Sequence, residues 1–176
     1  ARNLHQGVKE VVARYGGQVP DAHEEVLSLP GIGDYTAGAI LSIAHNKPEP
    51  AIDGNVLRVI SRLQKIEDPI EKPQTRRRID AAVRSMMAAV PRYCDITQAL
   101  MELGAIVCIP GNPRCDGCPW TEFCLARKDG VQGSLPKKKS PAPVQIVEVS
   151  SGILIENGRV LAVKRPAKGL LAGMWE

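Results

Sequence analysis

The stretch LPGIGDYTAGAILSIAHNKPEPAIDGNVLR, residues 29–58, decides the fold of this chain. It begins with two glycines around one apolar residue, Gly31-Ile32-Gly33, directly before an amphipathic segment with helical spacing. A proline-containing loop, residues 47–50, ends that segment, and Asp53 then stands at the start of another helical pattern. The stretch therefore predicts two helices whose N-terminal ends present a glycine turn and a carboxylate.

The glycine turn is suited to holding a phosphate group. Gly31 and Gly33 permit backbone angles that other residues resist, and the N–H groups at the start of the next helix carry partial positive charge. Ile32 is expected to anchor the turn in the core, Asp34 to cap the helix, and Thr36 to follow in its first turn. We expect the turn to grip a nucleic-acid backbone without reading its sequence. The alternative is a tight turn between two core helices that binds no ligand.

Residues 1–125 show helical periodicity throughout, and no strand is predicted among them. Short loops join the helices, so the pattern indicates an all-helical bundle in which Ile106 is among the residues facing the core. The exposed side of the helix that begins at Pro73 carries three arginines in a row. The predicted helices occupy residues 2–15, 21–29, 34–44, 53–63, 73–90 and 96–107.

Four of the five cysteines crowd into one loop, with the spacing Cys108-x6-Cys115-x2-Cys118-x5-Cys124. Thiolates bind iron or zinc, and without an export signal a metal or cluster site is favoured over a disulfide framework. The compact spacing, with a single CxxC pair, favours one [4Fe–4S] cluster over a zinc ribbon. Spacing alone leaves zinc open. Cys94 lies outside the pattern and is predicted to be a structural thiol.

The pattern changes after residue 125. Residues 126–145 are charged and contain glycine and proline, which is typical of a linker. From residue 146 the alternation is that of strands, and two predicted strands, 146–155 and 159–164, flank Asn157-Gly158, a strong hairpin signal. A second domain with β-structure therefore begins near residue 146.

Composition sets broad limits. The 176 residues suffice for one ordinary domain and part of a second, and 44% are hydrophobic, which supports a core. The net charge of +4 is compatible with a polyanionic partner without proving one. No apolar run reaches the roughly 18–20 residues of a membrane span, and the N-terminal residues do not show the pattern of a signal peptide. We expect no membrane partner and an intracellular location, cytoplasmic or nucleoid-associated if the source is bacterial. Since both ends look cut, we also expect a fragment that lacks its natural termini.

The glycine turn and the cysteine loop occur together in a known family. The chain resembles the helix–hairpin–helix DNA glycosylases of the endonuclease III superfamily, and most closely their adenine-specific branch. The matching strings are LPGIGDYTAGAIL, IDGNVLRVISRL, ALMELGAIVC, the four-cysteine spacing and GLLAGMWE. The resemblance implies a mainly α glycosylase domain at 1–125, with the helix–hairpin–helix at 29–45 and a [4Fe–4S] loop at 108–124. After a linker, residues 146–176 resemble the start of an α+β Nudix-like domain that recognises 8-oxoguanine.

The resemblance also implies roles for individual residues. Members that cleave the DNA strand carry a lysine two residues after the second glycine, and this lysine forms a Schiff base with the sugar. Here that position is Tyr35, which implies a monofunctional glycosylase. Asp53 matches the catalytic aspartate, which would stabilise positive charge developing on the deoxyribose; without the resemblance it would be a plain N-cap. Tyr35 and Asn55 resemble residues that line this site. The family's second acid, a glutamate that protonates the departing adenine, has no match in this chain.

The implied activity is hydrolysis of the N-glycosidic bond of adenine mispaired with 8-oxoguanine or guanine, during base excision repair. The adenine would be flipped out of the duplex for this reaction. We expect a monomer whose partner is double-stranded DNA, and we expect this stretch of chain to be inactive alone because the general acid is absent. Two alternatives stay open: a bifunctional, endonuclease III-like enzyme acting on pyrimidine lesions, and a non-catalytic DNA-binding module with a structural metal.

Overall fold

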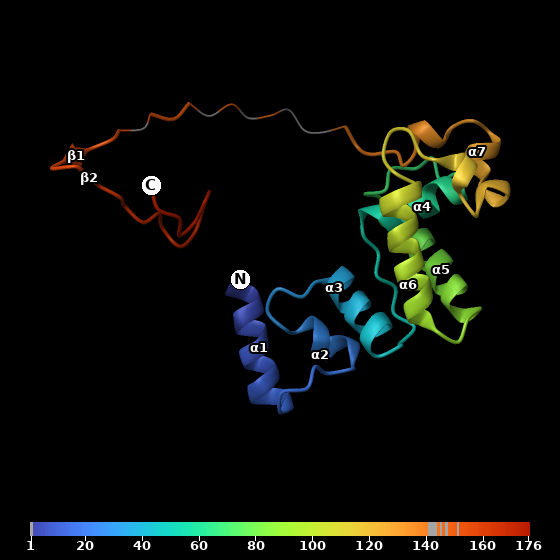
Figure 1. Cartoon of the computed structure of the whole chain (residues 1–176), viewed down its shortest axis with the longest axis horizontal. Coiled ribbons are helices and arrows are strands. Elements are labelled where there is room, and N and C mark those ends of the chain that lie inside the picture. The colour runs from blue at the N-terminus through green and yellow to red at the C-terminus, as the bar shows by residue number, and fades with distance from the viewer. Residues whose placement is uncertain (1, 141–143, 145, 147, 151) are drawn as a thin grey trace. The chain divides into compact units, whose positions relative to one another are not determined.

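The computed structural model describes residues 2–140, 144, 146, 148–150 and 152–176. The chain separates into two compact units, Ala1–Ser140 and Pro141–Glu176 (Figure 1). Each unit is described by itself below.

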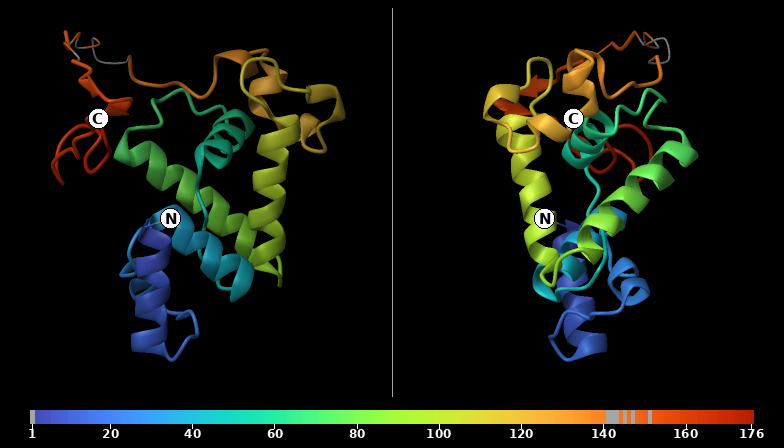
Figure 2. Two further views of the ribbon diagram at one scale, coloured as in Figure 1. Left: turned by 60° about the vertical axis from the view of Figure 1, so that its left-hand side comes forward. Right: turned by 90° about the vertical axis from the view of Figure 1, so that its right-hand side faces the viewer.

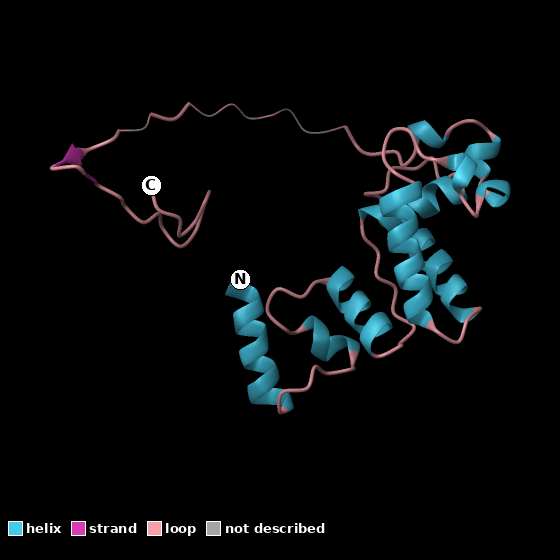
Figure 3. Cartoon of the chain, viewed as in Figure 1, coloured by secondary structure: helices cyan, strands magenta, loops and turns pink. Residues whose placement is uncertain are grey.

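The first unit is built from helices, and its described residues contain no strand (Figure 3). Two π-helical turns, η1 (Ile40–Ala44) and η2 (Leu103–Val107), continue α3 and α6, and single 3₁₀ turns occupy Cys115–Gly117, Thr121–Phe123 and Gln132–Ser134. The helical prediction for this part of the chain is thereby confirmed. The α-helices are α1 (Arg2–Tyr15), α2 (His23–Leu27), α3 (Asp34–Ala39), α4 (Gly54–Leu63), α5 (Pro73–Ala88), α6 (Tyr93–Glu102) and α7 (Leu125–Lys128).

Helix α4 supplies four of the ten main-core residues and lies among α5, α6 and α7 (Figure 2). Five of its ten residues are apolar, but the polar residues Arg58, Ser61 and Arg62 are buried as well, so the helix is covered on most sides. A smaller core, formed by Val26, Ala37 and Leu41, joins α2 to the helix behind the glycine turn. The main core consists of Val56, Leu57, Val59, Ile60, Ile66, Ile70, Ile79, Val83, Met87 and Leu100.

Helix α6 differs from its prediction at both ends. It begins at Tyr93 rather than residue 96, because Asn46 Oδ1 accepts a hydrogen bond from the Tyr93 backbone N–H at 2.7 Å. This side chain lies 47 residues away in sequence and satisfies a helix-terminal donor that no neighbouring residue could reach. Ile106 was predicted to face the core but is 59% exposed. It lies in η2, where the wider π turn breaks the α-helical register.

Helix α1 spans the predicted residues, but its apolar stripe is largely open. Only Val11 is buried, whereas Leu4, Val8 and Val12 are exposed. The amphipathic spacing therefore predicted the helix correctly without predicting burial of its apolar side within the described chain.

The predicted linker, residues 126–145, begins too early. Ala126 is fully buried and Leu135 is 2% exposed, so both belong to the helical unit. The Ile70 backbone N–H then donates to the carbonyl of Lys137 at 3.0 Å, which fixes the chain further still. The charged composition concealed these three contacts. Each involves a single residue, and Lys137 makes its contact through a backbone carbonyl.

The second unit holds one short hairpin of β1 (Ile155–Glu156) and β2 (Arg159–Val160), paired with Ile155 opposite Val160. Asn157 and Gly158 have φ of 49° and 73°, as a two-residue hairpin turn requires, so the predicted turn is confirmed. The predicted strands are too long. Residues 146, 148–150 and 152–154 are not in a strand, while Val147 and Ser151 of that prediction lie outside the described residues.

Across the described residues, every helix is too short or too polar to traverse a lipid bilayer.

Candidate active site and cysteine loop

The glycine turn is fixed on both sides. Gly31 has φ of +81°, and a Cβ at this position would lie 2.6 Å from Cβ of Asn3, so glycine is required there. The Ile32 backbone N–H donates to the carbonyl of Leu29 at 3.1 Å. The Ile32 side chain packs against the smaller core, as the sequence predicted. The turn is therefore held by the close approach of Gly31 to Asn3 and by the packing of Ile32 against the smaller core.

The start of α3 carries no side-chain cap. Gly33 is the N-cap residue in extended conformation, and Asp34 is the first helical residue, so the prediction that Asp34 caps this helix is wrong. One residue further along, its carboxylate sits past the position from which a cap reaches the first N–H groups. Gly33 is exposed, and a Cβ built on it would meet only open space. Thr36 follows, half-buried, in the first turn.

Asp53 is the N-cap of α4, and both its carboxylate oxygens are engaged. Oδ1 accepts the Val56 backbone N–H at 2.8 Å, and Oδ2 accepts Nδ2 of Asn55 at 2.9 Å. Asn55 Oδ1 in turn accepts a guanidinium N–H of Arg58 at 2.8 Å. The orientation of the carboxylate is therefore fixed by the Val56 backbone N–H and by the side chain of Asn55, which Arg58 holds in turn.

The same Arg58 reaches the cysteine loop. Its Nε donates to the carbonyl of Cys108 at 2.7 Å, and its terminal nitrogen donates to the carbonyl of Gly104 at 2.7 Å. Burial lowers the pKa of the Arg58 guanidinium, and the neighbouring charge of Arg62 acts in the same direction. A continuous hydrogen-bonded path thus joins Asp53 to the first cysteine of the loop. Sequence reasoning missed Arg58, although an arginine pair with helical spacing inside an otherwise apolar helix was a visible signal.

Gly104 is required by the position of Asn55. A Cβ on Gly104 would lie 2.5 Å from Cβ of Asn55, a separation that neither side can accommodate without moving. We therefore expect Gly104→Ala to push Asn55 from its bond with Asp53 and to cost about 1–3 kcal/mol of stability through overpacking. Denaturant unfolding measures the loss.

A suitable control is Gly117→Ala, because a Cβ on Gly117 meets nothing within 4 Å. Equal unfolding free energies for Gly104→Ala and Gly117→Ala would contradict the expected clash at Asn55.

Tyr35 lies on the surface, in the same depression as the residue that precedes Asp53. It is 42% exposed and lines an open depression together with Ile52, the residue directly before Asp53. Arg76 and Arg77 of α5 line the same depression, with Asp34, Pro50 and Asp80. No hydrogen bond between Tyr35 and Asp53 is found in the described part of the chain. The structure thus brings the first residues of α3, Asp34 and Tyr35, to one depression with α5, and joins Asp53 with Asn55 in a separate hydrogen-bonded group.

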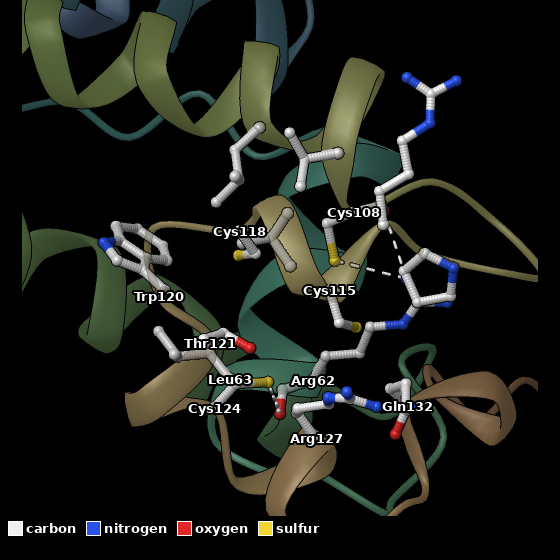
Figure 4. A pocket seen from close by; sticks show the side chains of 15 residues that line it. Arg62, Leu63, Cys108, Cys115, Cys118, Trp120, Thr121, Cys124, Arg127 and Gln132 are labelled. Atoms are coloured by element: carbon white, nitrogen blue, oxygen red, sulfur yellow. Dashed lines mark hydrogen bonds between the residues drawn. The ribbon is translucent and has the colours of Figure 1, made fainter.

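The four cysteines of the loop surround one hollow, which Trp120 also lines (Figure 4). All four are half-buried free thiols. Burial raises the pKa of the Cys115 thiol, Arg127 opposes the shift, and the other three cysteines raise it further. Four sulfur atoms close enough to repel one another as thiolates form a donor set that a cationic metal centre would stabilise.

The structure brings the four cysteines to one hollow without gathering their side chains at a single metal site. Within the described residues, no three His, Cys, Asp or Glu side chains approach closely enough to bind a single metal ion. Tetrahedral zinc would need sulfur atoms about 2.3 Å from one centre. The two 3₁₀ turns of the loop contain no buried residue, and its contacts with the main core come from the partly buried Cys108 and Trp120.

Comparisons with known proteins agree with this architecture. The helix-hairpin-helix motif matches residues 14–43. The chain is 32% identical to the adenine DNA glycosylase of Schizosaccharomyces pombe, over 99% of this chain and 47% of that protein. It is 38% identical to the adenine DNA glycosylase of Arabidopsis thaliana, over 100% of this chain and 30% of that protein.

A solved structure of a trapped covalent intermediate between endonuclease III and DNA matches with a TM-score of 0.57 and 25% identity, covering 73% of this chain and 58% of that one. The chain spans less than half the length of the two curated relatives. The motif, the helical architecture and the identity over nearly the whole chain lead to one family. The chain belongs to the helix–hairpin–helix, endonuclease III superfamily, and within it to the MutY-like branch of the adenine DNA glycosylases.

Proposed function

We propose that the full-length protein removes adenine mispaired with 8-oxoguanine or guanine from duplex DNA, by hydrolysing the N-glycosidic bond, and works as a monomer in base excision repair. The observation that carries the proposal is the fixed carboxylate of Asp53 at the start of α4. Its two oxygens accept hydrogen bonds from the Val56 N–H and from Asn55, and these bonds orient the carboxylate. Family membership supplies the substrate class.

In the proposed reaction, Asp53 stabilises the positive charge that develops on the deoxyribose as the bond to adenine breaks. A fixed carboxylate needs no reorganisation when that charge develops, which is the main source of such catalysis. Asn55 positions the carboxylate, and Arg58 positions Asn55. The orientation of the Asp53 carboxylate therefore depends on Asn55, and the orientation of Asn55 depends on Arg58.

Tyr35 accounts for the proposed lack of strand cleavage. A Schiff base with the sugar requires an amine, and a phenol at the end of the glycine turn cannot form one. Tyr35 is partly exposed beside Ile52, so it can line the sugar without attacking it.

The proposed DNA contact combines the glycine turn with helix α5. The turn offers the free N–H groups at the start of α3, and Gly33 leaves open space in front of them. Arg76 and Arg77 line the adjoining depression, and the ion pairs found in the described residues do not include either of them. Asp80 also lines it but is paired with Arg84 at 2.9 Å. A DNA strand passing the turn would meet these two arginines next.

We predict that the double substitution of Arg76 and Arg77 by Gln weakens duplex binding and reduces its salt dependence. Each lost phosphate contact lowers the slope of log K against log salt by about 0.9, so the slope should fall by about 1–2. Fluorescence anisotropy over a salt series measures it.

Arg78→Gln is the matched control, because Arg78 lies on the same helix, is equally exposed and does not line the depression. The two proteins would show the same slope if these arginines do not touch DNA.

We propose that Cys108, Cys115, Cys118 and Cys124 hold a [4Fe–4S] cluster. The residues fit it, because four half-buried free thiols from one compact loop line one hollow, and thiolates are the ligands of such clusters. The cluster would supply a structural anchor for a loop that has no buried residues in its own turns. We also propose that residues 146–176 begin a Nudix-like domain that recognises 8-oxoguanine.

The test is release of free base from a panel of duplexes by the full-length protein, followed by chromatography. We expect adenine from 8-oxoguanine·adenine and guanine·adenine pairs, and no base from duplexes with pyrimidine lesions. Release of a pyrimidine base would instead favour the endonuclease III-like alternative. Binding without any base release would favour a DNA-binding module.

A further inference from the structure

Arg62 is a buried cation without an acidic partner. Its residue exposure is 2%, and none of the ion pairs in the described ranges of the chain involves it. Removing a charge from water costs several kcal/mol unless hydrogen bonds and an opposite charge compensate it. The site therefore lacks, among the described carboxylates, the anion that a buried guanidinium needs.

The contacts of Arg62 converge on the cysteine loop. One terminal nitrogen donates to the carbonyl of Ile109 at 2.8 Å, and to both the carbonyl and Sγ of Cys108 at 3.3 Å each. The Cys124 thiol donates to the Arg62 carbonyl at 3.5 Å (Figure 4). Arg62 thus touches the first and the last cysteine of the loop, and its Nε donates to the carbonyl of Leu135 where the chain leaves it.

A second cation shares this position. Arg58 is 9% exposed, and its Nε donates to the same Cys108 carbonyl. One carbonyl dipole does not neutralise two guanidinium groups. Four thiolates outweigh the positive charge of an iron–sulfide core, so a ligated [4Fe–4S] cluster is a net anion, and it would lie directly beside these cations.

We propose that Arg62 is a positioning residue for the cluster, whose buried positive charge balances the anionic cluster and whose hydrogen bonds hold Cys108 in place. This rests on the proposed [4Fe–4S] cluster. Hydrogen bonds to the ligand sulfur and a nearby positive charge favour the more reduced, more negative state of such a cluster. Loss of Arg62 should therefore move the midpoint potential to a more negative value and loosen the iron.

The experiment compares three variants of the full-length protein. Arg62→Met removes the charge and keeps an unbranched side chain, whereas Arg62→Lys keeps the charge and loses the planar fork. Arg127→Met is the matched control: Arg127 lines the same hollow, but its side chain is 44% exposed and paired with Asp116 at 3.0 Å. The readouts are iron and sulfide per chain, the rate of iron loss to a chelator, and the midpoint potential.

Arg62→Met should lose iron about 10–100-fold faster than the wild type, as expected for groups that support metal ligands, and should have a more negative potential. Arg62→Lys should lie between the two, and Arg127→Met should keep iron as the wild type does and shift the potential less than Arg62→Met, because its charge is exposed to solvent. Equal iron loss from Arg62→Met and wild type, or equal losses from Arg62→Met and Arg127→Met, would overturn the proposal. If Arg62→Met fails to fold by circular dichroism, Arg62→Lys decides: wild-type iron retention and potential would overturn it.

Metal analysis of the wild type distinguishes a failure of the proposed cluster from a failure of the inference about Arg62. Zinc in place of iron would remove the proposed cluster and this inference with it. Iron and sulfide in the wild type, combined with unaltered Arg62 variants, would remove only the inference.

Discussion

Asp53→Asn is expected to lower the rate of adenine excision by about 10²–10³-fold, the loss typical of removing one oriented electrostatic group from a transition state. The substitution removes the negative charge facing the sugar and keeps the shape of the side chain. Single-turnover release of adenine from an 8-oxoguanine·adenine duplex measures it. A variant that keeps the wild-type rate would show that Asp53 is only a helix cap.

The fold should survive this change. Asparagine is as good an N-cap as aspartate, and its side-chain oxygen can still accept the Val56 N–H. The bond from Asn55 is lost, which costs about 1 kcal/mol, or about 2–4 °C in Tm. Asp68→Asn is the matched control, since Asp68 is a surface carboxylate paired with Lys72 at 2.7 Å. We expect Asp68→Asn to excise adenine at the wild-type rate.

Cys118→Ala is expected to abolish iron binding and to lower Tm, since the free energy of binding the cluster contributes to folding and each kcal/mol lost lowers Tm by about 2–4 °C. Among the described hydrogen bonds, none uses the Cys118 Sγ, so the substitution removes a ligand and little else. Iron and sulfide analysis, visible absorbance and thermal unfolding measure the two effects.

Cys94→Ser is the control for this experiment. Among the described hydrogen bonds, those of the Cys94 thiol go to Arg92 and Asp95 near the start of α6, and Cys94 lies outside the loop spacing. The variant should keep its iron and its Tm. Full iron content in Cys118→Ala, or loss of iron in Cys94→Ser, would contradict the proposed ligand set.

The sequence predicted the features that depend on neighbours along the chain. Asp53 at the start of α4 and Asn157-Gly158 in the hairpin turn were correct, because an N-cap and a two-residue turn are decided within four residues. Helix existence followed from periodicity. The four cysteines line one hollow because they are close in sequence.

Long-range contacts escaped prediction. The cap that Asn46 gives to Tyr93, the anchoring of Leu135 by Arg62, and the clash that reserves Gly104 for glycine all join segments far apart in sequence. The chain from Asp53 to Cys108 through Asn55 and Arg58 is of the same kind. The sequence contains these residues but does not show that they are bonded to one another. The packing of α6 and η2 against α4 brings them into one network.

The most direct test of the proposed activity is one gel assay with a duplex carrying 8-oxoguanine opposite adenine. The full-length protein is incubated with the labelled adenine strand, and samples are run with and without hot alkali. We predict strand breaks only after alkali, because the base is removed, Tyr35 forms no Schiff base and the strand stays intact. Breaks before alkali, or a protein–DNA adduct trapped by borohydride, would contradict a monofunctional glycosylase, and no breaks after alkali would contradict adenine excision itself.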